Sequence, residues 1–172
     1  MAKEVELSEL TRETLKSFDI ENINELKNKI FEIVLGNQHE YYEKFLEVAP
    51  DLEIDHMQKI YQYYLADRSG LKQDYTPKSL SKLLSKLSGN SKQIIDMCAG
   101  TGALTIQSWV EDKTRQFKLY EIDDNVIPFL IFNMAIRNIP CEIYNADVLA
   151  EKVFKKYLIV KGEKFGEVRA CQ

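Results

Sequence analysis

The sequence predicts an α/β fold in which a helical region precedes a mostly parallel sheet, and three observations support this. Apolar residues recur at helical spacing from about residue 6 to residue 66. From residue 93 onward, short apolar runs alternate with amphipathic segments, as strands do when crossover helices join them in a parallel sheet. A glycine turn, Gly100-Thr101-Gly102, follows the first of these runs. We therefore expect a helical region at residues 1–70 and an α/β domain at residues 71–172.

The N-terminal region is expected to contain four helices. Their apolar residues repeat at intervals of three and four, which places them on one face of each helix. The four faces begin at Leu7, Ile23, Tyr41 and Met57. Gly36-Asn37, Pro50 and Ser69-Gly70 are expected to end the second, third and fourth helices.

The α/β domain is expected to open with a helix whose N-cap is Thr76 and whose first residue is Pro77. Strands are then expected at residues 93–97, 116–121, 141–145 and 157–160, and helices at residues 102–111 and 124–137. Asp123 and Asp124 are expected to cap the helix that starts at Asn125. We expect about four parallel strands, and residues 165–169 are expected to form a weaker strand that closes a C-terminal hairpin.

The composition is that of a globular domain, with 172 residues, 45% apolar and 29% charged. No apolar run reaches the roughly 20 residues that a membrane span needs, and the charged N-terminus has no signal-peptide core. We therefore expect a cytoplasmic protein that does not bind membranes. Cys98, Cys141 and Cys171 lie far apart, and the chain has two histidines. These features predict reduced thiols and no metal site.

The charge is distributed unevenly along the chain. Residues 1–60 carry seven basic and fourteen acidic side chains, whereas residues 61–172 carry sixteen basic and thirteen acidic side chains. An acidic region repels a phosphate backbone, and the C-terminal excess of positive charge is small. We therefore expect contact with DNA only through a partner.

Acidic residues follow three successive predicted strands. Asp96 ends the first, Glu121 ends the second and Asp147 follows the third. Because ligands of open α/β sheets bind beyond the carboxyl ends of the strands, we expect these residues to lie near one ligand. Glu121 is placed to bind ribose hydroxyls, Asp147 to accept a bond from the adenine amino group, and Val148 or Leu149 to pack on the adenine ring.

The turn itself favours S-adenosylmethionine over a dinucleotide. The dinucleotide fingerprint has a third glycine, and Thr105 stands in its place. A carboxylate at Asp96 suits an ammonium or sulfonium group better than a pyrophosphate. The residues alone leave a nicotinamide cofactor open as the alternative.

The region from about Asp74 to Asp147 resembles the N6-adenine DNA methyltransferases, especially the methylation subunits of type I restriction–modification systems. The resemblance rests on Asp74-Tyr75-Thr76-Pro77, on the Asp-x-x-x-Gly-x-Gly turn from Asp96 to Gly102, on Glu121, on the helix residues 129–135 and on Asp147-Val148-Leu149. It implies a Rossmann-like sheet that binds S-adenosyl-L-methionine. The cofactor-binding residues that it implies are Tyr75, Thr76, Pro77, Asp96, Cys98, Gly100, Thr101, Gly102, Leu104, Glu121, Ile122, Asp147 and Val148.

The sequence departs from this family at the catalytic motif. The family has Asn-Pro-Pro and an aromatic residue after the fourth strand, and these bind the flipped adenine. Here Lys161-Gly162-Glu163-Lys164 follows residues 157–160, and no two prolines are adjacent. We assign no catalytic residue and expect the chain to be incomplete as an enzyme. The expected partner is a second methyltransferase subunit, which would complete it, or a second copy of the chain in a homodimer. The alternatives are a non-catalytic module of a DNA-modification system and, more distantly, a fragment of a nicotinamide-dependent oxidoreductase.

Overall fold

The computed structural model describes residues 6–66, 76–87 and 89–171. The helical region consists of α1 (Leu7–Ser17), the short 3-10 helix η1 (Ile23–Glu25), α2 (Leu26–Leu35), α3 (His39–Val48) and α4 (His56–Tyr64). The remaining helices are α5 (Lys78–Leu87), α6 (Ala103–Glu111) and α7 (Ile127–Ile136). The strands are β1 (Gln93–Asp96), β2 (Gln116–Glu121), β3 (Cys141–Asp147), β4 (Lys152–Val160) and β5 (Glu167–Cys171).

The helix ends follow the sequence signals where these are described. The second helix stops at Gly36, and Asn37 takes a left-handed conformation with φ 48°. Asp55 caps α4, since its Oδ1 accepts the N–H of Gln58 at 2.8 Å. The predicted stop at Ser69-Gly70 lies outside the described residues. The predicted start of the next helix is one residue early: α5 begins at Lys78, and the carbonyl of Pro77 accepts the N–H of Ser81 at 3.0 Å, so Pro77 takes the cap position that was predicted for Thr76.

The predicted cap of α7 is wrong in detail. The helix begins at Ile127, later than expected, and its N-cap residue, Val126, makes no side-chain cap bond. Asp123 instead holds the preceding turn, because its Oδ1 accepts the backbone N–H of Asn125 at 2.8 Å. Asp124 lies within this turn, and its side chain pairs with Lys155 at 3.3 Å.

The five strands form one sheet in the order β1-β2-β3-β4-β5. The first three strands are parallel, as predicted, but β4 runs antiparallel to β3, which corrects the prediction of four parallel strands. The reason is the length of the connection. Only residues 148–151 join β3 to β4, whereas a parallel crossover needs about a dozen residues. The C-terminal hairpin is confirmed, since β5 pairs antiparallel with β4.

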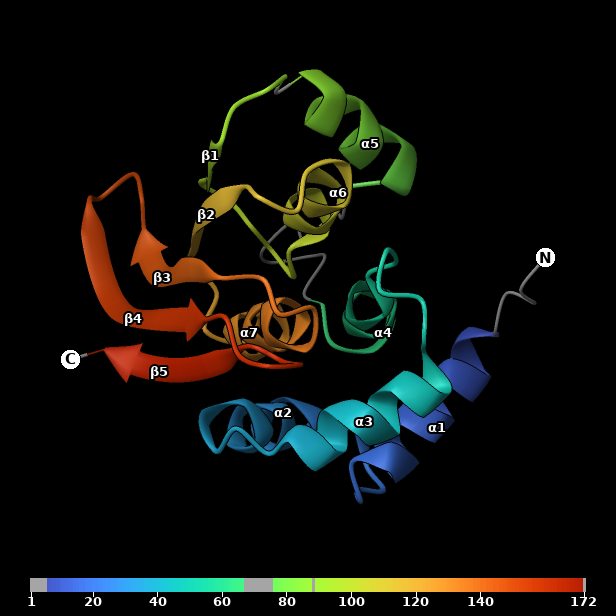
Figure 1. The fold of residues 1–172 in the computed structure, drawn as a ribbon. Coiled ribbons are helices and arrows are strands. Elements are labelled where there is room, and N and C mark those ends of the chain that lie inside the picture. The colour runs from blue at the N-terminus through green and yellow to red at the C-terminus, as the bar shows by residue number, and fades with distance from the viewer. Residues whose placement is uncertain (1–5, 67–75, 88, 172) are drawn as a thin grey trace.

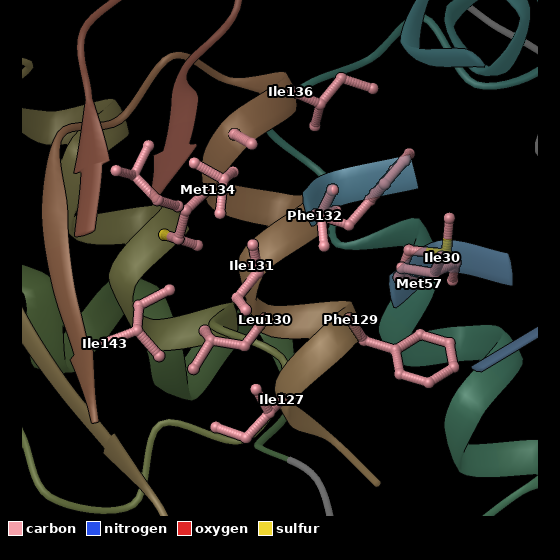
Figure 2. Packing of buried hydrophobic residues seen from close by; sticks show 14 of the residues in the cluster. Ile30, Met57, Ile127, Phe129, Leu130, Ile131, Phe132, Met134, Ile136 and Ile143 are labelled. Atoms are coloured by element: carbon pink, nitrogen blue, oxygen red, sulfur yellow. The ribbon is translucent and has the colours of Figure 1, made fainter. Parts of the chain in front are cut away.

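The helix α7 lies between the sheet and the N-terminal helices (Figure 1). Every residue of α7 is buried, as a helix with apolar residues on all sides requires. Figure 2 shows Leu130 and Met134 on the side of the sheet, near Ile143, while Phe129 and Phe132 lie toward the N-terminal helices. One buried cluster therefore includes residues of the N-terminal helices, α7 and the sheet. The division of the chain at residue 70 stays a prediction, because residues 67–75 are not described.

The two edges of the sheet differ. At the β5 edge, the side-chain amide of Asn37 makes the two hydrogen bonds to Val168 that a neighbouring strand would make. Its Nδ2 donates to the carbonyl of Val168 at 3.1 Å, and its Oδ1 accepts the N–H of Val168 at 2.7 Å. At the other edge, β1 pairs with β2 alone within the described residues. Of the described helices, none has the length and apolar character that a membrane span requires.

Candidate cofactor-binding site

Asp96 ends β1 with a carboxylate that is only partly bonded. Its Oδ1 accepts the N–H of Cys98 at 3.2 Å. Its Oδ2 is buried and has no hydrogen-bond partner among the described residues. Burial raises the pKa of this carboxyl above its usual 3.8. A buried acceptor without a partner in the described part of the chain suits a ligand that brings a hydrogen-bond donor or a positive charge.

The turn after β1 depends on both of its glycines. Gly100 and Gly102 have φ angles of 55° and 100°, which other residues rarely adopt. A Cβ on Gly102 would also lie 2.6 Å from Cε of Met134 and 3.0 Å from Cδ1 of Leu130. The second glycine therefore permits close packing of the turn against α7.

Glu121 joins the end of β2 to this turn. Its Oε2 accepts the N–H of Gly100 at 2.9 Å, and its Oε1 accepts the N–H of Asp123 at 2.8 Å. Burial raises the pKa of Glu121, although both backbone bonds oppose the rise. The N–H of Gly100 is thus bonded within the protein, as is that of Gly102, which donates to the carbonyl of Ala99 at 2.9 Å.

The end of β3 is held by its own short turn. Oδ1 of Asp147 accepts the N–H groups of Leu149 and Ala150, each at 3.0 Å. Val148 is half-buried, whereas Leu149 is 95% exposed and has room to cover a ligand. Asn145, which sequence reasoning missed, donates from Nδ2 to the carbonyls of Glu121 and Ile122 at 3.2 and 3.1 Å. It therefore fixes the end of β2 against β3.

Asp96, Glu121 and Asp147 lie at the same end of the parallel strands, but at different positions along the strand direction. Asp96 pairs in register with Leu119, and Glu121 pairs with Asn145. Each acid therefore stands two residues beyond the level of the one before, a step of roughly 6–7 Å along the strands. Glu121 contacts the glycine turn directly. No described hydrogen bond joins Asp147 to that turn.

A cavity of about 180 Å³ lies between β1, α5 and α6, and Asp96 is one of the residues that line it. Of the predicted cofactor residues, Asp96 and Leu104 line it. Thr105 also lines it, and Oγ1 of this residue is buried and without a partner among the described residues. Glu121 and Asp147 do not line this cavity, so the structure leaves the predicted residues in two neighbouring groups.

The other predicted residues occupy varied positions. Cys98 and Ile122 are exposed beside the turn and the end of β2. Thr76 and Pro77 precede α5, and Tyr75 lies outside the described residues. Thr101 is buried, and its Oγ1 donates to Oδ2 of Asp55 at 2.7 Å. Thr101 therefore supports the turn from the protein interior.

A buried polar network behind the turn was not expected from the sequence. Asp55 accepts bonds from Thr101 and from Nδ2 of Asn133, at 2.7 and 2.8 Å. The same Nδ2 donates to the carbonyl of Thr101 at 2.8 Å. Arg137 donates to Oδ1 of Asn133 at 3.0 Å and to the carbonyls of Leu52 and Ile54 at 2.7 and 2.8 Å. The network thus connects α4, the glycine turn and α7. Its one sequence signal is the spacing of Asn133 and Arg137, four residues apart in an apolar helix.

The sheet, the glycine turn and the acids at the strand ends define an α/β domain of the class that binds nucleotide-containing cofactors beyond parallel strands. A family model described as N-6 DNA Methylase matches residues 52–169, and the chain belongs to this family. The match begins before α4, so the family region includes Asp55 and its network. Searches of curated proteins and of solved structures gave no match.

Proposed function

We propose that this chain is the S-adenosyl-L-methionine-binding part of an N6-adenine DNA methyltransferase. The observation that carries the proposal is the bond between Glu121 and Gly100, which brings the acid of β2 to the turn that follows Asp96. Family membership supports the choice of cofactor.

The residues present fit this cofactor chemically. Oδ2 of Asp96 would accept a hydrogen bond from its ammonium group, and the carboxylate oxygens of Glu121 retain lone pairs for the ribose hydroxyls. Asp147 would accept a bond from the adenine amino group, with Val148 and Leu149 against the ring. When bound, the cofactor supplies an electrophilic methyl group. The residues of this chain would hold and orient it.

We infer that a second polypeptide supplies the acceptor side of the reaction. Asn-Pro-Pro does not occur in the 172 residues, and the segment after β4 is Lys161-Gly162-Glu163-Lys164. A lysine ammonium has no acceptor for an adenine amino group. We therefore place the Asn-Pro-Pro element and the DNA contacts on a partner subunit of a restriction–modification system.

One observation favours a second candidate function. The β4–β5 hairpin completes the far side of the sheet, and Asn37 covers its edge. A sheet finished in this way also suits a non-catalytic module that regulates a DNA-modification system, with or without the cofactor.

Calorimetric titration with S-adenosylmethionine, and separately with NAD, tests the cofactor site. We expect binding of the former only, and we expect Asp96→Asn and Glu121→Gln to weaken it at least tenfold, about 1.4 kcal/mol. Asp124→Asn is the matched control, because Asp124 lies near Glu121 but pairs at the surface with Lys155. Equal affinity for NAD, or no effect of either site variant, would contradict the proposed site.

Methyl transfer to adenine is the test of the partner. The chain is mixed with DNA and with an Asn-Pro-Pro-containing polypeptide, which we expect to be encoded beside it. We expect labelled methyl groups on adenine only when both polypeptides are present. If the chain binds the cofactor but no such mixture methylates DNA, the non-catalytic module is the better assignment.

A further inference from the structure

Helix α4 belongs to the N-terminal region, yet it contacts two of the turns at the candidate cofactor site. Asp55, its N-cap residue, accepts the hydroxyl of Thr101, in the turn after β1, at 2.7 Å. Tyr61, six residues further along, donates its hydroxyl to Oδ2 of Asp123, in the turn after β2, at 3.3 Å. Six residues of helix span about 9 Å. One helix therefore reaches the turns that follow two paired strands.

The turn after β1 needs support from outside, because both neighbours of Thr101 are glycines. A glycine has no side chain to fix its conformation, and it loses more conformational freedom on folding than any other residue. Gly100 and Gly102 nevertheless hold φ angles of 55° and 100°. Thr101 stands between them and is 1% exposed. Its side chain is therefore the anchor of this stretch of the turn.

Two hydrogen bonds anchor Thr101, and both lead to Asp55. The hydroxyl donates directly to Oδ2 of Asp55. Nδ2 of Asn133 donates both to Oδ1 of Asp55 and to the carbonyl of Thr101, each at 2.8 Å. The bond to the carbonyl also fixes the peptide plane between Thr101 and Gly102. Because an ionised carboxylate accepts through both oxygens, Asp55 can hold the hydroxyl, the amide and the N–H of Gln58 at once.

The turn after β2 receives a second, weaker support. Tyr61 is 2% exposed, and its ring packs edge to face on Phe129 of α7, with the ring centroids 5.0 Å apart. Its hydroxyl reaches Asp123 over a distance that is long for a hydroxyl donor. The N–H of Asp123 in turn donates to Oε1 of Glu121 at 2.8 Å. Tyr61 therefore supports the residue that orients the carboxylate proposed to bind the ribose hydroxyls.

We propose that α4 positions the cofactor site, with Asp55 and Tyr61 as positioning residues for the turns after β1 and β2. This inference rests on the proposed function and assigns a role to the N-terminal region, which would order the site before the ligand arrives. A site that is ordered in advance loses less binding free energy to its own ordering. Both side chains are buried and act through Thr101 and Asp123.

Hydrogen exchange in the cofactor-free protein tests the positioning by itself. Thr101→Val removes the hydroxyl and keeps the shape of the side chain, whereas Thr101→Ser keeps the hydroxyl. We expect Thr101→Val to speed exchange of the Gly100 and Gly102 N–H groups at least tenfold, and Thr101→Ser to change it less than about threefold. Asn37→Gly is the control, because it removes hydrogen bonds at the β5 edge and should leave these two N–H groups unchanged.

Calorimetric titration with S-adenosylmethionine tests whether the positioning affects the site. The temperature is one at which circular dichroism shows every variant folded. We expect Asp55→Ala and Thr101→Val each to weaken binding about tenfold, and the double variant to bind no more weakly than either, because the two residues share one contact. Thr101→Ser and Asn37→Gly should bind within about threefold of wild type. If Asp55→Ala does not fold, the two Thr101 variants provide the test.

Tyr61→Phe tests the second support, because it removes the hydroxyl and keeps the ring. We expect it to speed exchange of the Asp123 N–H and to weaken cofactor binding about threefold, less than Thr101→Val, since the bond it removes is long. Tyr63→Phe is the matched control on the same helix. Tyr63 is 67% exposed, and the loss of its hydroxyl should change neither quantity.

Three results would overturn the inference. One is unchanged exchange of Gly100 and Gly102 in Thr101→Val. Another is faster exchange with wild-type affinity for the cofactor, which would make the network a support of the fold alone. The third is a loss of affinity in Asn37→Gly as large as that in Thr101→Val, because affinity would then follow global stability. Absence of binding to the wild-type chain overturns the proposed function instead, and the exchange data then decide whether α4 orders the turns.

Discussion

The carboxylate of Glu121 accepts the backbone N–H of Gly100 at 2.9 Å, across 21 residues of sequence. This bond holds the turn after β1 against the end of β2. The same carboxylate is the expected partner of the ribose hydroxyls, so one side chain would both shape the turn and bind the ligand. Its state of ionisation should therefore control the affinity of the site.

The affinity for S-adenosylmethionine should fall as the pH is lowered from about 7 to about 4, through the raised pKa values of Asp96 and Glu121. Burial raises the pKa values of Asp96 and Glu121, so both carboxyls take up protons above their usual 3.8 and 4.5. A cationic ligand favours the ionised form of Asp96 and should release protons on binding. Titration calorimetry in buffers of different ionisation enthalpy measures this release. Proton uptake, or constant affinity across this range, would contradict the role of the acids.

Asp96→Asn should stabilise the cofactor-free protein at neutral pH. A raised pKa means that the ionised carboxylate destabilises the fold, and this penalty applies fully above the folded pKa and vanishes below the usual 3.8. The asparagine keeps an acceptor for the N–H of Cys98. Urea unfolding at several pH values should show a gain at pH 7 that shrinks as the pH falls. A gain in the free energy of unfolding that stays unchanged or grows as the pH falls would contradict this prediction.

Asp55→Ala should destabilise the protein by about 3 kcal/mol, because it leaves buried partners such as Thr101 without an acceptor. Asp51→Ala is the control, since Asp51 is exposed and should cost less than about 1 kcal/mol. Chemical denaturation measures both. Equal losses would show that the buried network contributes little.

Gly102→Ala should cost more stability than Gly89→Ala. Both positions have positive φ, but a Cβ at Gly89 meets nothing within 4 Å, whereas one at Gly102 meets Met134 and Leu130. We expect about 1 kcal/mol at Gly89 and about 2–3 kcal/mol at Gly102. Adding Met134→Ala to Gly102→Ala should not restore full stability, because the backbone strain remains. Urea midpoints compare the three variants, and equal costs at the two glycines would contradict the packing argument.

Asn37→Gly should expose the edge of β5 while keeping a residue suited to φ 48°. The loss of two hydrogen bonds to Val168 should cost about 1–2 kcal/mol. Hydrogen exchange should show faster exchange of the Val168 N–H, with the N–H of Leu119 in the interior strand β2 as the reference. Unchanged protection of Val168 would mean that Asn37 does not cap this edge.

Local patterns in the sequence predicted most elements of the fold. Residues 116–121 form β2, as predicted, because alternating polar and apolar residues, two of them aromatic, indicate a strand directly. The direction of β4 was missed because residues 152–156 are mostly polar, so the strand was expected to start at residue 157. With the true start, the connection from β3 is too short for a crossover.

By itself, the sequence determined the order of the strands and helices, the glycine turn and the acids at the ends of the strands, since each depends on residues close together in the chain. Only the tertiary structure decided that Glu121 bonds to Gly100, that Asp55 supports Thr101 from 46 residues away, and that the leucines of α5 face outward. Helical periodicity identifies an apolar face but not what covers it, because burial is set by contacts between distant segments.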